Sequence, residues 1–525
     1  MTKLAITMLL ASGTLAFGQT TKPSTKPSTQ PADFEEAAEE AREGVADAAV
    51  TGGGGVFVEA TPQRVVDVTQ KVFPAVVRLD VAQEVYRQGK RTFQRGTGSG
   101  VIFSPEGYIL TNYHVAGRAA EIKITLANKE RVNARLIGDD HWTDLAVVQL
   151  DMDEIREKGI EFPYAELGES GSLIYGQDVI AIGTPFGLAR TLTMGVVSNT
   201  ERTFYPTEQD IDGYETGNFS NWIQMDTPIA PGNSGGPLVD LSSKVVGINT
   251  RGFPGQNLNF AIPMETARRV KDAILNTVEF EDDGTIKTRG KVIRADLGMT
   301  LKPLQDLEDF YDIDVNEGVL ISSVDNGSPA KEAGVRVSDI LLELNGQPTN
   351  VRFPEQLAAA RRMVAQLPIG EIVKAKLLRD GEELELEMPV VRLESRIGEE
   401  RELKQWGASV RDVTRVYANQ RRLNDDSGVV ITSTRSGFAA DKAEMQNGDV
   451  IRSINGQPAT DLETFMALYD KSVEEKQEQV LLQIQRGRGL SRALLRIEYD
   501  DDAEEEVDAL KEAVEAEAEN PLDAE

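Results

Sequence analysis

A sequence repeat in the C-terminal half is the feature that most constrains the fold. The segment Gly-Val-Leu-Ile-Ser-Ser begins at Gly318 and returns as Gly-Val-Val-Ile-Thr-Ser at Gly428, and the Asn-Gly-Gln-Pro turn at Asn345 returns with the same offset of 110 residues. A constant offset across two separated motifs indicates a duplicated domain. Since each copy has the size of a small domain, we predict two related domains over residues 285–393 and 400–497.

Residues 61–277 have the pattern of a separate β domain. Short runs of β-forming residues, separated by turns that contain Gly and Pro, occupy residues 75–81, 100–103, 108–111, 122–126, 145–150, 178–183 and 245–249. Many short strands of this kind predict a sandwich or a barrel. A helix is expected to begin with Thr61 as its N-cap and Pro62 at its first position. Residues 265–275 have the spacing of a closing helix.

The composition excludes several classes of function. The chain carries 56 Lys and Arg residues against 86 Asp and Glu residues, a formal net charge of −30 at pH 7. Such a chain repels the phosphate backbone, so we expect no nucleic-acid partner. It has no cysteine, which excludes disulfides, thiolate metal sites and a Cys nucleophile. With only two histidines a three-His metal centre cannot be built, and we expect no metal and no organic cofactor.

The two ends of the chain differ from the rest. Lys3, an apolar run and small residues before Gln19 predict a secretory signal peptide over residues 1–18. The protein should therefore be exported, to the periplasm where the host has an outer membrane, and no later stretch is apolar enough to span a membrane. Residues 19–60 have the composition of a flexible tether. Residues 498–525 carry 14 acidic residues and one lysine, which predicts a solvated acidic tail.

The segment Gly-Asn-Ser-Gly-Gly-Pro, residues 232–237, is the strongest sign of chemistry. A nucleophilic serine needs an exposed hydroxyl on a tight turn, and backbone N–H groups that are free to bind an oxyanion. Glycines on both sides of Ser234 permit such a turn. The candidate oxyanion donors are the N–H groups of Gly232 and Ser234. Taken alone, the segment could also be an ordinary hairpin turn.

A serine nucleophile needs a histidine base and a carboxylate that orients it. His114 follows the 108–111 strand, and strand ends are where a rigid scaffold presents catalytic groups. Asp144 enters an apolar strand, where a charge is costly without a partner. We therefore predict that His114, Asp144 and Ser234 form a catalytic triad. His141 lies only three residues from Asp144, so we expect it in a surface loop instead.

These motifs resemble one protease family. The order His, Asp, Ser is that of chymotrypsin-like proteases. The strings TNYHVAG, TDLAVVQL and GNSGGPL, followed by a duplicated module, resemble the HtrA/Deg serine proteases over about residues 60–497. The resemblance implies a mainly β chain, with a chymotrypsin-like double β-barrel followed by two PDZ domains. It also implies an ATP-independent quality-control protease that forms a homotrimer or a multiple of trimers, with an activation loop at 226–231 and a specificity loop at 249–259.

A PDZ domain binds an extended peptide as an added strand and holds its C-terminal carboxylate with backbone N–H groups. The capture loop is an apolar-Gly-apolar turn. The candidate peptide-binding residues are Arg294, Leu297, Gly298 and Met299 in the first repeat, and Trp406, Gly407 and Ala408 in the second. Arg294 is the candidate partner of the carboxylate. Either loop could instead be a plain strand-entry turn, and the second repeat could serve assembly.

The sequence thus predicts a serine endopeptidase that degrades misfolded or unfolded exported proteins. Binding of an unfolded chain end to the first PDZ domain would shift the protease domain toward a formed oxyanion hole. Two alternatives stay open: a chaperone or scaffold with minor proteolysis, and a regulated signalling protease that makes one specific cut. The triad and the glycine-rich segment count against a pure scaffold, which needs neither.

Overall fold

The computed structural model describes residues 60–499, except 185–189, 204–208, 212–213, 254–256, 282–283, 306, 312–316, 396 and 424. The predicted signal peptide, and nearly all of the predicted tether and acidic tail, lie outside these residues. Within the described residues, no helix is long and apolar enough to cross a membrane.

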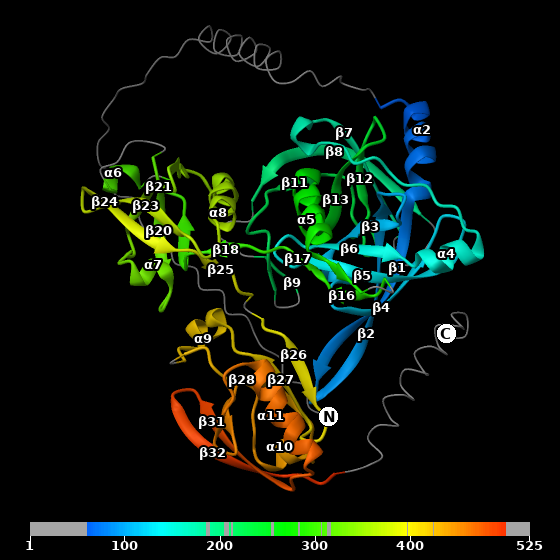
Figure 1. Ribbon diagram of the computed structural model, residues 1–525. Coiled ribbons are helices and arrows are strands. Elements are labelled where there is room, and N and C mark those ends of the chain that lie inside the picture. The colour runs from blue at the N-terminus through cyan, green and yellow to red at the C-terminus, as the bar shows by residue number, and fades with distance from the viewer. Residues whose placement is uncertain are drawn as a thin grey trace, which may run out of the picture. The chain divides into compact units, whose positions relative to one another are not determined.

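Six strands close into a first barrel (Figure 1). They are β1 (Val76–Arg87), β2 (Lys90–Ile102), β3 (Tyr108–Thr111), β4 (Ala119–Thr125), β5 (Arg131–Asp140) and β6 (Leu145–Leu150). The order β5, β4, β1, β2, β3, β6 returns on itself because β6 also pairs with β5. Strands β1 and β2 form a long hairpin that turns at Gln88 and Gly89, which both have positive φ. Its outer half is partly exposed and polar, so the sequence pattern predicted only its buried half.

A second closed barrel follows. Its strands, in barrel order, are β11 (Trp222–Met225), β14 (Leu258–Pro263), β13 (Val245–Phe253), β12 (Pro237–Asp240), β7 (Asp178–Gly183) and β8 (Thr191–Arg202). Two helices flank the pair, α2 (Pro62–Val72) and α5 (Met264–Thr277), and Thr61 caps α2 as predicted. One apolar cluster contains residues of both barrels and of both helices, so the two barrels share a core. The predicted double barrel is confirmed.

The two repeats fold into matching sheets. In the first, β19 (Met299–Lys302), β20 (Val319–Val324), β21 (Ile340–Leu344), β23 (Ile372–Arg379) and β24 (Glu382–Pro389) pair in that order, with helix α8 (Leu357–Ala365). In the second, β27 (Ala408–Asp412), β28 (Val429–Thr434), β29 (Val450–Ile454), β31 (Gln479–Arg486) and β32 (Gly489–Arg496) pair in the same order, with helix α11 (Leu462–Glu474). The duplication is therefore confirmed. Among the described residues, the second sheet has one strand more than the first, β26 (Glu400–Leu403), outside β27.

Candidate active site

Ser234 lies on a turn whose backbone is held from the first barrel. Ser99, in β2, is fully buried, and its Oγ donates to the carbonyl oxygen of Gly232 at 2.6 Å. The N–H of Ser99 donates to the carbonyl oxygen of Ser234 at 2.8 Å. Ser99 alone therefore bonds two backbone carbonyl oxygens of the turn. Among the described residues, no acceptor bonds the N–H of Gly232 or of Ser234, which is the condition for an oxyanion site.

The glycine after Ser234 is required by a close approach of two chains. Gly235 has φ +83°, and a Cβ there would lie 2.1 Å from the carbonyl oxygen of Ser99 and 2.3 Å from Thr111 Oγ1. No L side chain fits such a space, and the positive φ would strain one. Gly235 therefore lets the turn pack against β2, where Ser99 holds it.

His114 and Asp144 form a hydrogen-bonded pair. His114 lies on the short helix α3 (Tyr113–Ala116), and its Nδ1 is 2.9 Å from Asp144 Oδ1 and 3.0 Å from Oδ2. The His114 N–H also donates to Asp144 Oδ1, at 3.1 Å. Gln83 supports α3, because its Nε2 donates to the carbonyl oxygens of His114 and Val115. The side chain of Asp144 is fully buried, whereas 24% of the His114 side chain is exposed. The His114 side chain is therefore partly open to solvent, whereas the carboxylate that bonds it is not.

Thr250 connects this pair to Ser234. Thr250, in β13, donates its Oγ1 hydrogen to Asp144 Oδ2 at 2.6 Å, and its carbonyl oxygen accepts the hydroxyl of Ser234 at 2.9 Å. Burial alone would raise the pKa of Asp144, but the charge of His114 and the hydrogen bonds from His114 and Thr250 outweigh it and lower the pKa. Asp144 therefore stays ionised. In the described residues the Ser234 hydroxyl bonds Thr250 rather than His114, and a rotation about its Cα–Cβ bond is needed to redirect it.

His141 lies in the turn between β5 and β6, as predicted, but it is only partly exposed. Its ring packs among Tyr113, Trp142 and Tyr214, with centroids 6.0, 4.6 and 5.1 Å away. Its Nδ1 is 3.3 Å from the carbonyl oxygen of Glu215. Burial lowers the pKa of His141, so the ring is neutral at pH 7. The sequence did not reveal this aromatic cluster because its members come from segments far apart in the chain.

The capture loop of the first repeat is only partly as predicted. Leu297 is fully buried and Gly298 has φ +71°, a loop conformation that needs glycine. Arg294, however, is buried and makes two 2.7 Å hydrogen bonds to the carboxylate of Asp140. Its guanidinium is thus engaged in the protease domain, so the structure contradicts its prediction as the partner of a peptide carboxylate. The N–H of Gly298 donates to Asp296 Oδ1 at 2.9 Å, which a ligand carboxylate would have to displace.

The loops that the resemblance singled out are partly described. In residues 226–231, Pro228 accepts the Thr193 hydroxyl at 2.8 Å, and the Ile229 N–H donates to Asn259 Oδ1 at 3.2 Å. In residues 249–259, three residues lie outside the described set. Within it, the ring of Phe253 packs edge-on against that of Phe260.

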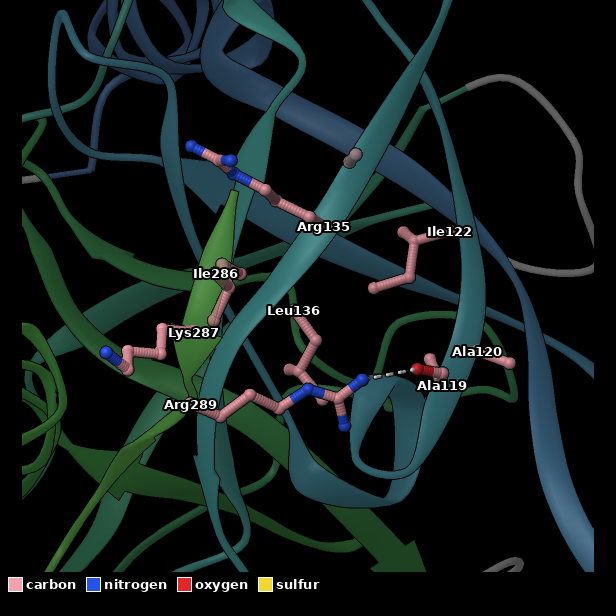
Figure 2. A pocket seen from close by; sticks show the side chains of 9 residues that line it. Ala119, Ala120, Ile122, Arg135, Leu136, Ile286, Lys287 and Arg289 are labelled. Atoms are coloured by element: carbon pink, nitrogen blue, oxygen red, sulfur yellow. Dashed lines mark hydrogen bonds between the residues drawn. The ribbon is translucent and has the colours of Figure 1, made fainter. Parts of the chain in front are cut away.

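A separate cavity of about 320 Å³ lies on the first barrel (Figure 2). It is lined by residues of β4, of β5 and of the segment 286–289, including Arg135, Lys287 and Arg289. None of its lining residues belongs to the serine site. Among the described residues, no group of three His, Asp or Glu side chains is arranged to hold a metal ion.

Comparison with known proteins gives consistent matches. A trypsin-like peptidase domain matches residues 98–248, and a PDZ domain matches residues 295–390 and 406–497. A probable periplasmic serine endoprotease DegP-like from Chlamydia trachomatis is 31% identical over 410 residues, 77% of this chain and 75% of that protein. Its counterpart from Marinomonas sp. is 36% identical over 72% of this chain and 74% of that protein.

A solved structure shares the fold. The HtrA-type protease AlgW with tripeptide is 30% identical, with a TM-score of 0.51, over 63% of this chain and 97% of that one. The double barrel, the two PDZ domains and relatives aligned over three quarters of their length lead to one assignment. The chain belongs to the DegP-like, HtrA-type serine endoproteases.

Proposed function

We propose that this protease acts in the periplasm on unfolded segments of exported proteins, with His114, Asp144 and Ser234 as its catalytic residues. The observation that carries the proposal is the set of hydrogen bonds by which Thr250 joins Ser234, through its carbonyl oxygen, to the Asp144–His114 pair, through its hydroxyl. No such set of hydrogen bonds is needed in a scaffold. The N–H groups of Gly232 and Ser234, which bond no acceptor among the described residues, support the same assignment.

The chemistry follows from the positions of these groups. The Ser234 hydroxyl turns from Thr250 toward the outer nitrogen of His114, which takes its proton as the oxygen attacks the scissile carbonyl. The ionised Asp144 stabilises the imidazolium and holds it in one orientation. The N–H groups of Gly232 and Ser234 stabilise the oxyanion. His114 then returns the proton to the leaving amine, and water repeats the sequence to release the acyl group.

The first repeat is the proposed regulatory site. Within the described residues, β19 pairs only with β20, so its other edge can accept an extended peptide as an added strand. We expect a bound C terminus to raise the fraction of chains with a formed oxyanion hole. Assembly into a homotrimer or a multiple of trimers stays a prediction that rests on the resemblance alone.

The test is degradation of casein, an unfolded protein, by the purified mature chain without ATP. Casein should be cut by the wild type and not by Ser234→Ala, and the rate should rise when a C-terminal peptide saturates the first repeat. A wild-type chain that leaves casein intact with and without such peptides, while suppressing aggregation of a heated client, would replace the proposal with the chaperone alternative. Cleavage of one native client but not of casein would favour the signalling protease.

A further inference from the structure

The second repeat carries a strand at the edge where a PDZ ligand would bind. Strand β26 pairs antiparallel with β27, with Glu400 opposite Arg411 and Leu403 opposite Ala408. On its other side β27 pairs with β28. Since β27 directly follows the capture loop, its outer edge is the one that accepts a peptide in this class of domain. In the second repeat that edge is covered by residues 400–403.

The end of β26 has the position and contacts of a ligand's last residue. The side chain of Leu403 is fully buried in the core of the repeat. Its carbonyl oxygen accepts the N–H of Trp406 at 3.1 Å and the N–H of Gly407 at 2.9 Å. Loop N–H groups of this kind hold the carboxylate of a bound peptide. Leu403 therefore uses both the apolar site and the N–H groups that a C-terminal residue would need.

The loop is fixed against helix α11. The ring of Trp406 packs edge-on against Phe465 and Tyr469, with centroids 5.9 and 5.0 Å away. The N–H of Gln405 donates to the hydroxyl of Tyr469 at 3.2 Å. An incoming peptide would have to break these contacts as well as the β26 pairing.

Among the described residues, the first repeat has no such strand. The residues before its capture loop form β18 (Ala295–Asp296), which pairs with β25 (Val391–Arg392) and not with β19, so within the described residues β19 pairs only with β20. The two repeats otherwise match, since the carbonyls of Leu297 and Trp406 accept equivalent N–H groups, from Ala330 and Ala440. The difference is therefore local to the segment before each loop.

We propose that residues 400–403, Glu-Arg-Glu-Leu, are a built-in ligand of the second PDZ domain. While β26 is paired, that domain binds no C terminus of another peptide. Peptides bind only to the first repeat. The last statement rests on the proposed role of the first repeat, whereas the occupancy of the second does not.

The test uses full-length Ser234→Ala protein and hydrogen exchange measured by mass spectrometry. The probe is the free peptide Gly-Glu-Glu-Arg-Glu-Leu with a C-terminal carboxylate, and its C-terminal amide is the control. Without peptide, residues 408–412 should already be protected. Saturating peptide should leave their exchange unchanged while it slows exchange at 299–302. Peptide-dependent protection of 408–412 in this protein would overturn the proposal.

A second variant opens the site. Leu403→Ala should raise exchange at 408–412 by roughly tenfold or more, and the peptide added in trans should restore the protection. The matched control is Leu495→Ala, an equally buried leucine of the same core, which should gain no peptide binding at 408–412. Equal behaviour of the two variants would refute the built-in ligand. If the peptide leaves exchange at 299–302 unchanged, the first repeat does not bind this peptide, but the exchange of 400–412 still decides the second.

Discussion

Replacing Ser99 by alanine should damage catalysis although Ser99 touches no substrate. Its hydroxyl donates to Gly232 and accepts the N–H of Thr184 at 2.8 Å. Both of those backbone groups are buried and have no other hydrogen bond among the described residues. Leaving a buried polar group unpaired costs about 1–3 kcal/mol, so the two together should lower the free energy of unfolding by about 2–6 kcal/mol.

The activity effect follows from the freed carbonyl of Gly232. Without Ser99 Oγ, the turn of Ser234 can rotate and carry the oxyanion N–H groups out of position. Removing one oxyanion donor outright costs about 10²–10³ in kcat, and Ser99 acts only through orientation, so we expect a fall of about 10–100-fold. KM should hardly change, because the substrate ground state does not depend on these N–H groups.

Three measurements separate positioning from simple instability. Kinetics on a chromogenic peptide should show the loss in kcat, and the inhibition constant of a peptide boronate should rise by a similar factor. The control is Ser472→Ala, which removes another buried hydroxyl, one that donates to the carbonyl oxygen of Tyr469 at 2.7 Å. It should lower the midpoint of unfolding of the second repeat and leave kcat unchanged. A Ser99→Ala protein that is destabilised but keeps its kcat and its boronate affinity would refute the reasoning.

Three further predictions concern the same region. Thr250→Val keeps the shape but removes the 2.6 Å hydrogen bond to Asp144, so kcat/KM on the same peptide should fall about tenfold or more, at a cost of about 1.5–3 kcal/mol; an unchanged value would exclude this role. Gly235→Ala should lower the free energy of unfolding in urea by about 2–5 kcal/mol, because its Cβ meets Ser99 at positive φ; a loss below 1 kcal/mol, equal to that of an exposed glycine, would contradict the packing. Burial raises the pKa of Asp139 to about 6, whereas an unfolded Asp titrates near 3.9. The folded chain therefore holds the proton more tightly, and stability falls as pH rises from about 4 to 6. Across that window, the stability of Asp139→Asn relative to the wild type should rise by up to about 3 kcal/mol. If urea unfolding gives the same difference in free energy between the two proteins at both ends of the window, the pKa shift is refuted.

The sequence predicted the parts of the fold that local patterns encode. The strands at 108–111, 145–150 and 178–183 have the predicted bounds, because each is a continuous apolar run that is buried. The outer half of the β1–β2 hairpin was missed because its residues are mostly polar and partly exposed, so they form no apolar run. The repeat predicted two similar domains, but the pairing of β26 depends on backbone contacts that no motif marks.

The catalytic site was also predicted only where its residues stand in recognisable motifs. His114, Asp144 and Ser234 stand in motifs that chemistry makes recognisable, and the structure brings them together. Ser99 and Thr250 were not found, because each contributes to the site through its backbone as well as its hydroxyl, and backbone groups leave no trace in a sequence. The only signal for Ser99 was its place between two glycines. Arg294 was misassigned because its partner, Asp140, lies 154 residues away.

The division of the site between two barrels has a consequence for behaviour under stress. Ser99, His114 and Asp144 belong to the first barrel, while Thr250 and Ser234 belong to the second. The hydrogen bond from Thr250 to Asp144, and those from Ser99 to the turn of Ser234, cross the seam where the barrels meet. Heat or denaturant that loosens the contact between the barrels should inactivate the enzyme before either barrel unfolds. A protease that works where other proteins unfold would therefore lose its activity before it unfolded enough to be cut by other copies of itself.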